Sequence, residues 1–192
     1  MITDINQLDL TKKYTYADYL AWQFQERVEL LRGYISKMAA PNRVHQKVSI
    51  NLSVIFSNHL KGNPCEVYAA PFDVRLSKRK DDRLIKTVVQ PDICIVCDTS
   101  KLDDRGCLGA PELIVEILSK STSKKDLKDK KDLYEENGVE EYWVVHPREA
   151  TIARFLLKNG KYEFDRYYTE GDVLLSMAID DLALDVTEAF ID

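Results

Sequence analysis

The sequence has no long apolar run, no large excess of one charge, and few cysteines or histidines. No segment approaches the roughly 18 consecutive apolar residues that cross a bilayer. The N-terminal stretch MITDINQLDLTKKYTY lacks the basic and apolar regions of a signal peptide. These absences predict a cytoplasmic protein that does not enter a membrane. No repeat, linker or low-complexity segment divides the chain, so its length predicts one domain over residues 1–192.

The charge of the chain does not point to a particular partner. The net charge is −5, which does not indicate a nucleic-acid-binding protein. It does not exclude one either, because a local basic patch is sufficient for that attraction. Apolar residues make up 45% of the chain and charged residues 31%, which is ordinary for a globular protein.

Cysteine and histidine are too sparse, or wrongly spaced, for zinc binding or nucleophilic catalysis. The four cysteines are expected to be free thiols in a cytoplasmic protein. Cys94 and Cys97 form a C-x-x-C, but no second one completes a zinc site, and an odd spacing within a strand sends the two side chains to opposite faces. We therefore interpret them as buried structural cysteines. No serine or cysteine stands at triad spacing from His45, His59 or His146, and His45, at a helix start, is interpreted as a structural hydrogen-bonder.

The order of apolar patterns predicts a mixed sheet flanked by helices. Predicted helices cover residues 16–25, 43–60 and 123–137, and predicted strands cover 66–76, 87–98, 112–118 and 141–146. From residue 43 to 147 the order is helix, three strands, helix, strand, which predicts an α/β (α+β) core. A helix capped by Thr15 and a hairpin precede this core within residues 14–40. A meander over 150–192 follows it, with Asn159-Gly160 as a type I′ turn.

One carboxylate interrupts the apolar strand PELIVEILS. Alternation along residues 112–118 places Glu116 on the same face as Ile114 and Leu118. Burying an unpaired carboxylate costs several kcal/mol, so something must compensate the charge. Glu116 is either a core glutamate paired with a buried Arg or Lys, or part of a site at the sheet.

Two further charged residues occupy unusual positions. Asp92 follows Pro91 and directly precedes an apolar run; an aspartate there is a turn residue or a site residue. On the helix after Glu116, Lys130 falls near the middle of an apolar arc, whereas Lys131 lies at its edge. Leu127, Leu133, Tyr134 and Asn137 define that arc. Lys130 either extends its ammonium to water or faces the interior.

Together these three residues predict a metal-dependent site. Two acids from neighbouring strands would repel one another unless a cation or a proton lay between them. Mg²⁺ takes one or two protein carboxylates and completes its shell with water and phosphate oxygens. An ammonium beside it can stabilise the charge that develops on a phosphate or orient the attacking water. Asp92 and Glu116 are therefore expected to bind Mg²⁺ or Mn²⁺, with Lys130 beside the ion.

The same residues resemble the PD-(D/E)XK restriction-endonuclease-like superfamily, and within it the bacterial "putative restriction endonuclease" family. The resemblance runs through nearly the whole chain. It rests on VELLRGYI, on NRVHQKVS with His45, on QPD with Asp92, on ELIVEILS with Glu116, and on DLKDKKDLYEENGVEEYWVVHP with Lys130. The superfamily lysine normally stands two residues after the glutamate, where this chain has Leu118, and the resemblance implies that Lys130 on the following helix replaces it.

The resemblance implies a restriction-endonuclease-like fold and a Mg²⁺-dependent endonuclease that cuts DNA. It also implies that the main-chain carbonyl of Ile117 is a third metal ligand, and that Glu29, which could otherwise face solvent, is an auxiliary acid. No organic cofactor is implied. Cutting both strands of a duplex needs two active sites, so a homodimer is expected.

A lysine-rich stretch adjoins the predicted site. Residues 119–131 read SKSTSKKDLKDKK, and Ser121 or Thr122 could cap the helix and leave N–H groups free for a phosphate. The stretch is either a solvated face or a DNA contact, which would be made by Lys120, Lys124, Lys125 and Lys131. The rival to an endonuclease is a catalytically silent DNA-binding or protein-interaction module that retains the fold. Keeping costly buried charges favours the enzyme, and the acidic composition slightly favours the rival.

Overall fold

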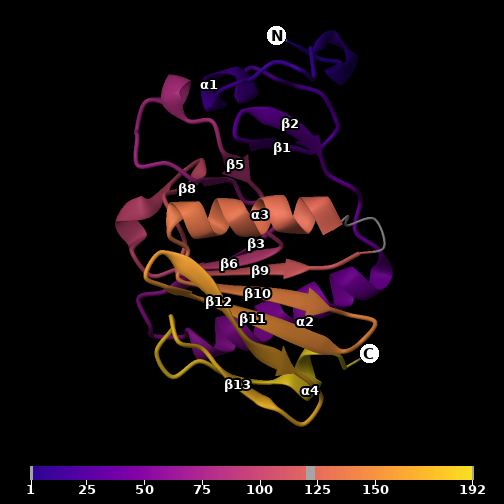
Figure 1. Ribbon diagram of the computed structural model, residues 1–192, viewed down its shortest axis with the longest axis vertical. Coiled ribbons are helices and arrows are strands. Elements are labelled where there is room, and N and C mark those ends of the chain that lie inside the picture. The colour runs from indigo at the N-terminus through magenta and orange to yellow at the C-terminus, as the bar shows by residue number, and fades with distance from the viewer. Residues whose placement is uncertain (1, 120–123, 192) are drawn as a thin grey trace.

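The computed structural model describes residues 2–119 and 124–191 and contains two six-stranded sheets (Figure 1). The helices are α1 (Tyr16–Tyr19), α2 (Arg43–His59), α3 (Lys124–Asn137) and α4 (Val186–Ala189), and 3₁₀ turns cover Ile5–Gln7, Asp82–Leu84 and Thr99–Lys101. The strands are β1 (Val28–Leu31), β2 (Tyr34–Lys37), β3 (Glu66–Ala69), β4 (Val74–Arg75), β5 (Val88–Val89), β6 (Ile93–Val96), β7 (Leu102–Asp103), β8 (Gly106–Leu108), β9 (Leu113–Ile117), β10 (Glu141–His146), β11 (Thr151–Lys158), β12 (Lys161–Tyr168), β13 (Val173–Leu175) and β14 (Ala183–Asp185).

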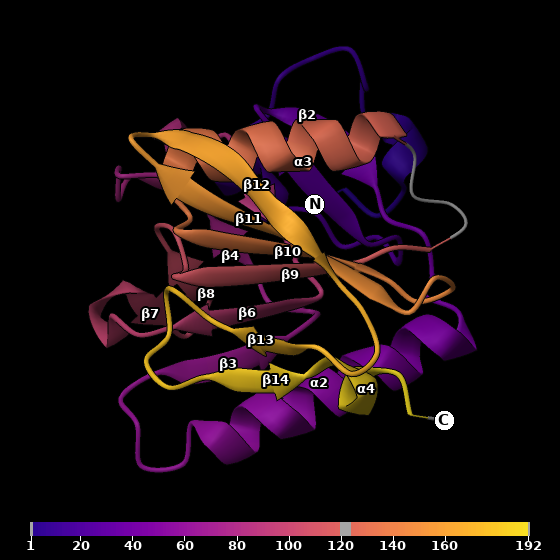
Figure 2. The ribbon, with the colours of Figure 1, turned by 60° about the horizontal axis from the view of Figure 1, so that its bottom comes forward.

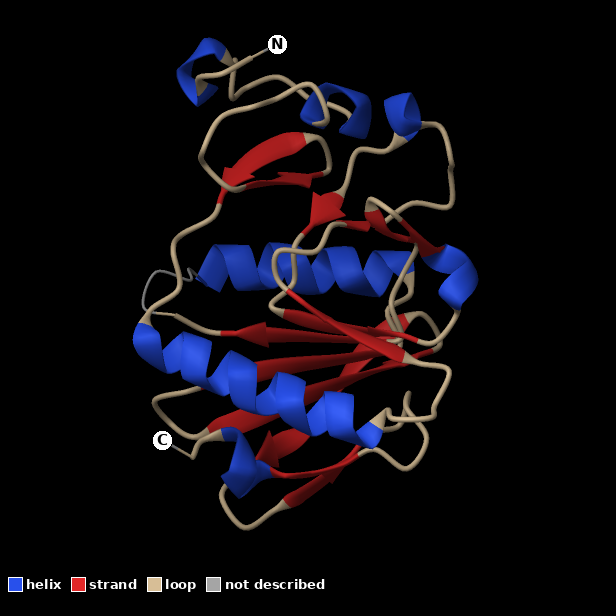
Figure 3. Ribbon diagram, turned by 180° about the vertical axis from the view of Figure 1, so that it is seen from behind, coloured by secondary structure: helices blue, strands red, loops and turns tan. Residues whose placement is uncertain are grey.

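The central sheet is mixed, as the sequence predicts, and its strand order is β12-β11-β10-β9-β6-β3. Strands β9 and β10 run parallel, and the other neighbouring pairs run antiparallel. Helix α2 crosses one face of this sheet and α3 lies on the other (Figures 1 and 3). The elements α2, β3, β6, β9, α3 and β10 follow one another in the predicted order of helix, three strands, helix, strand.

The two faces of the central sheet bury separate apolar cores. On one face, α2 residues such as Leu52 and Phe56 pack with Trp143, and the segment containing β13, β14 and α4 completes this core beside α2 (Figure 2). On the other face, Leu133 and Tyr134 of α3 pack over Ile114. The alternation predicted for residues 112–118 is confirmed, because Ile114 and Leu118 belong to the α3 side and their neighbours to the α2 side.

The second sheet corrects two predicted strands. Residues 66–76 and 87–98 were each expected to form one strand, but the first passes from the central sheet to a second sheet of order β2-β1-β5-β4-β8-β7, and the second passes back from that sheet to the central one. The breaks fall at Pro71 and Pro91, where proline supplies no N–H to continue a ladder. The second crossing places Asp92 at the junction of the two sheets, immediately before β6.

Local signals at both ends of the chain are confirmed, although the first helix is shorter than predicted. Thr15 forms a reciprocal capping box with Asp18, but α1 ends at Tyr19 instead of continuing to residue 25. Asn159 and Gly160 have φ values of +52° and +77°, as a type I′ turn requires between β11 and β12. In the described parts of the chain, no helix is long and apolar enough to cross a membrane.

The expectation of four free thiols is wrong for two of them. Cys65, after α2, and Cys97, after β6, form a disulfide across 32 residues. Cys94 and Cys107 are free and buried. Cys94 and Cys97 lie against opposite cores of the central sheet, as their odd spacing predicts. The pairing of Cys65 with Cys97 depends on tertiary placement, which the spacing of cysteines along the chain does not reveal.

Candidate active site

Strand register brings Asp92 and Glu116 together. In the antiparallel pair β6–β9, Ile93 lies opposite Val115, so the next cross-strand position joins Asp92 and Glu116 on the α3 side of the sheet. Directly opposed residues have Cβ atoms about 4.5–5.5 Å apart. The N–H of Ile117 donates to Oδ2 of Asp92 over 2.7 Å. The backbone of β9 therefore fixes the Asp92 carboxylate beside that of Glu116.

The partners of Glu116 come from α3. Its side chain is 11% exposed, and its Oε1 accepts hydrogen bonds from Lys130 Nζ at 2.9 Å and from Tyr134 Oη at 2.5 Å. Lys130 and Tyr134 are four residues apart, so they share one face of the helix. Glu116 thus faces an ammonium and a phenol, and the Lys130 side chain, at 14% exposure, points inward.

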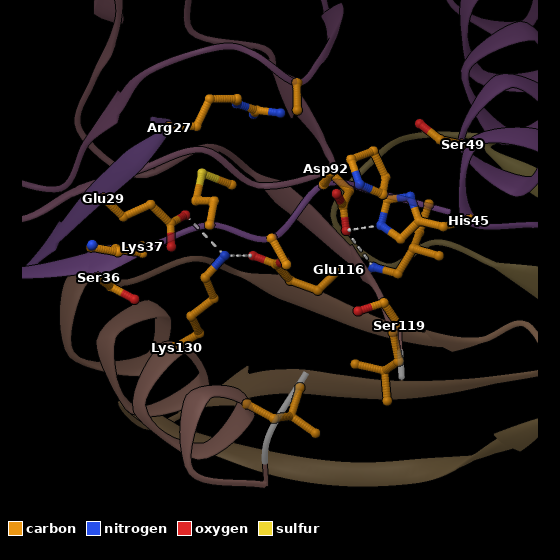
Figure 4. A pocket seen from close by; sticks show the side chains of 18 of the residues that line it. Arg27, Glu29, Ser36, Lys37, His45, Ser49, Asp92, Glu116, Ser119 and Lys130 are labelled. Carbon is orange, nitrogen blue, oxygen red and sulfur yellow. Dashed lines mark hydrogen bonds and ion pairs between the residues drawn. The ribbon is translucent and has the colours of Figure 1, made fainter. Parts of the chain in front are cut away.

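Glu29 joins the same cluster from the second sheet. It is 3% exposed, and its Oε1 accepts from Lys130 Nζ at 2.9 Å and from the N–H of Gln90 at 2.8 Å. The alternative that Glu29 faces solvent is therefore wrong. The Lys130 ammonium lies between Glu29 and Glu116, and so links the two sheets (Figure 4).

His45 is a residue of this cluster whose partner the sequence did not reveal. Asn42 caps the start of α2, which directs the His45 ring toward Asp92, with 3.2 Å between Nε2 and Oδ2. Among the described residues, its buried Nδ1 has no hydrogen-bond partner. Burial lowers the pKa of His45, but the hydrogen bond to Asp92 and the charges of Asp92 and Glu116 outweigh burial and raise it. The structural hydrogen bond expected of His45 is made to a site residue.

The charges of the cluster do not balance. Three carboxylates, those of Asp92, Glu116 and Glu29, are paired with one ammonium and the His45 ring. Burial raises the pKa of Glu116 to about 7 against the opposing effect of Lys130, and the charges of Asp92 and Glu29 add to the rise. Burial lowers the pKa of Lys130, but Glu116 and Glu29 outweigh burial and raise it. Lys130 therefore keeps its charge, and Glu116 binds a proton more readily than an ordinary glutamate does.

This excess of negative charge fits a divalent cation. In the part of the chain that the structure describes, no group of three or more His, Cys, Asp or Glu side chains is arranged to hold a metal. Two carboxylates are nevertheless enough for Mg²⁺, which keeps several waters and accepts main-chain oxygens. Asp92, Glu116 and Ile117 line one cavity, and the two carboxylates with the carbonyl of Ile117 would be such a set of hard oxygen donors.

The cavity has a volume of about 190 Å³ and opens between the β1–β2 hairpin and α2. Figure 4 shows Glu29, Ser36 and Lys37 on one side, His45 and Ser49 on the other, and Glu116 between them. The carboxylates and the Lys130 ammonium are reached through this cavity.

The structure gathers part of the predicted residue set. Glu29, Asp92, Glu116, Ile117 and Lys130 line one cavity. Lys131 instead places its ammonium over the Phe155 ring, at 5.0 Å from the centroid. Lys120 lies outside the described residues, as do the predicted caps at Ser121 and Thr122, and the side chains of Lys124 and Lys125 are not among those described. DNA contacts by these four lysines stay a prediction.

Tyr134 gives a test of the buried cluster. Replacing Tyr134 with phenylalanine removes one charge-assisted donor to Glu116, and we expect the free energy of unfolding to fall by about 1.5–3 kcal/mol. Tyr142→Phe is the matched control, because the Tyr142 hydroxyl is buried and has no hydrogen-bond partner among the described residues. Urea denaturation should show Tyr142→Phe to be neutral or stabilising. Equal losses in the two variants would contradict a specific contribution from the Tyr134 hydroxyl.

Comparisons with known proteins identify the family and the fold of this chain. The sequence model of a family described as "Uma2: Putative restriction endonuclease" matches residues 16–187. The chain is 29% identical over 138 residues to the Synechocystis protein named "Uncharacterized protein slr1290", covering 70% of each chain. It is 24% identical over 172 residues to "Uncharacterized protein sll1609" of the same organism, covering 80% of this chain and 94% of that one. A crystal structure described as a putative nuclease belonging to DUF820, from Anabaena variabilis, superposes with a TM-score of 0.72 at 16% identity, over 92% of this chain and 97% of the other.

Proposed function

This chain belongs to the Uma2 family, described as "Putative restriction endonuclease", and on that premise we propose that it is a metal-dependent endonuclease that hydrolyses DNA phosphodiester bonds. The predicted restriction-endonuclease-like fold is confirmed by the similarity to a solved nuclease structure. One observation carries the proposal. The Glu29–Lys130–Glu116 bridge and the Asp92 carboxylate lie in a single cavity, which places three recessed acids around one recessed ammonium, whereas Arg27 and Lys37 of the same lining are exposed.

Each residue has a distinct proposed role. Asp92, Glu116 and the carbonyl of Ile117 would hold Mg²⁺ or Mn²⁺, an ion that lowers the pKa of bound water and offsets phosphate charge. Glu116 offers Oε2 to that ion, because Lys130 and Tyr134 both bind Oε1. The N–H of Ile117 and the ring of His45 hold Oδ2 of Asp92 and so orient its carboxylate.

Lys130 stabilises the negative charge that develops on the scissile phosphate. Its ammonium is positioned in advance by Glu29 and Glu116, each at 2.9 Å, so little reorganisation is needed when a phosphate arrives. Glu29 is thus a positioning residue that acts through Lys130. The ammonium takes the place of the superfamily lysine, whose usual position is occupied here by Leu118, which packs against the apolar core.

A nuclease assay tests the proposal. Purified protein is incubated with plasmid, linear duplex, single-stranded DNA and RNA, each with Mg²⁺, Mn²⁺ or EDTA. We expect cleavage of at least one DNA substrate with either ion and none in EDTA. Cleavage of RNA alone would correct the substrate class. Binding without cleavage of any substrate would instead favour the catalytically silent module.

The expected homodimer is a separate prediction. Cutting both strands of a duplex needs two active sites, and a two-fold pair supplies them through a self-complementary interface. Light scattering at tens of micromolar protein should therefore give about twice the 22.1 kDa mass of one chain. A mass of one chain at that concentration would count against the dimer without affecting the site itself.

A further inference from the structure

We infer, on the basis of the proposed nuclease function, that the cavity takes a nucleotide whose base is unpaired, so that the substrate is single-stranded nucleic acid or an unpaired segment within a duplex. The site is recessed below the surface. The side chains of Glu116 and Lys130 are only 11% and 14% exposed. A phosphate must pass into the cavity to reach them, and a strand freed from its partner can bend into such a hollow more readily than a duplex can.

The cavity also has an apolar part in its lining. Beside the acids and Lys130, the lining includes the 38–41 segment between β2 and α2, together with Leu118 and Leu127. A charged phosphodiester group gains nothing from contact with an apolar surface, whereas the flat apolar face of a base packs against one favourably. The Met38 thioether is also a favourable neighbour for an aromatic ring.

The volume of the cavity also fits a single base. An apolar cavity of about 150 Å³ accepts a benzene ring. The 190 Å³ of this cavity therefore suits one base-sized ring and not a base pair. The open side leaves room for the sugar and phosphate.

A strand also has a continuous path past the site. A second hollow shares Leu118 and Ser119 with the first, and its lining includes Arg43 and Arg148. At the other side of the site, Arg27 and Lys37 line the first cavity. Basic side chains thus line both sides of the acids, and a positively charged groove is the feature that tracks the backbone of a single strand.

The test separates binding from cleavage. A fluorescein-labelled oligothymidylate and a labelled duplex of equal length are titrated with wild-type protein in EDTA, and anisotropy gives each dissociation constant. We expect the single strand to bind at least about ten-fold more tightly. Met38→Gln should weaken single-strand binding about five-fold and leave duplex binding unchanged, because it replaces an apolar wall residue with a polar one of similar size. The matched control is Met177→Gln, at a residue 71% exposed and outside the cavity, which should bind like wild type.

Each outcome bears on one proposal. Equal or tighter binding of the duplex, or an unchanged single-strand affinity in Met38→Gln, would overturn the unpaired-base inference. A preference for single strands without cleavage in Mg²⁺ or Mn²⁺ would remove the nuclease proposal and leave the inference standing. Cleavage of duplex DNA without any preference for single strands would support the nuclease proposal and overturn the unpaired-base inference.

Discussion

Lys130→Ala is expected to abolish DNA cleavage while leaving metal binding largely intact. The variant removes the ammonium that Glu29 and Glu116 position at 2.9 Å, but it keeps both carboxylates proposed to hold the ion. Lys131→Ala is the control on the adjacent residue, whose ammonium lies over the Phe155 ring. It should cut nearly normally and lose only some salt-sensitive affinity for DNA. Activity retained in Lys130→Ala and lost in Lys131→Ala would contradict both the helical-arc argument and the family resemblance.

The same variant should also be less stable without metal. Removing one partner of a buried ion pair costs about 3–5 kcal/mol, because the remaining charges stay buried. An acid whose folded pKa lies above its unfolded value contributes stability at low pH that is lost as the pH rises through the folded pKa. Burial already raises the pKa of Glu116 from 4.5 to about 7, and loss of Lys130 raises it further. Urea denaturation of Lys130→Ala in EDTA should therefore show a smaller deficit at pH 5 than at pH 8, whereas a deficit that grows as the pH falls would contradict this assignment.

Asp92→Ala is expected to weaken Mn²⁺ binding by at least about 100-fold, which exceeds the loss usually caused by changing a residue that only supports a ligand. It removes one of the two carboxylates and also the acceptor that the Ile117 N–H and His45 share. Asp104→Ala, at an exposed aspartate outside the cavity, removes the same charge and should bind like wild type. Calorimetric titration measures both affinities. Equal affinity in Asp92→Ala and wild type would exclude Asp92 as a ligand.

Periodicity along the chain was sufficient to locate the centre of the cluster. Glu116 stood out because alternation placed it on a buried face, and Lys130 because the helical period placed it in the middle of an apolar arc. Both signals depend only on the direction of a side chain from a regular element. The structure confirms both directions, since the two side chains meet at 2.9 Å.

The other parts of the site and of the fold depend on contacts between segments that are distant in the sequence. Alternation could not decide the position of Glu29, because Val28, Glu29 and Leu30 in β1 are all buried and so both faces of the strand are covered. The His45 ring contacts Asp92, which lies 47 positions later in the sequence. Local helix signals around His45 cannot predict a contact with so distant a residue. Apolar runs also predicted uninterrupted strands through Pro71 and Pro91, where the chain in fact changes sheets.

The cavity beside β6, β9 and α3 is proposed to bind the catalytic metal. Crystals grown with Mn²⁺ and measured near the manganese absorption edge would locate the ion. We expect one anomalous peak per chain, within about 2.0–2.4 Å of oxygens from Asp92, Glu116 and Ile117, and with Lys130 still beside Glu116. An anomalous peak elsewhere, or an undisturbed Asp92–Glu116 pair without a peak at saturating Mn²⁺, would contradict it.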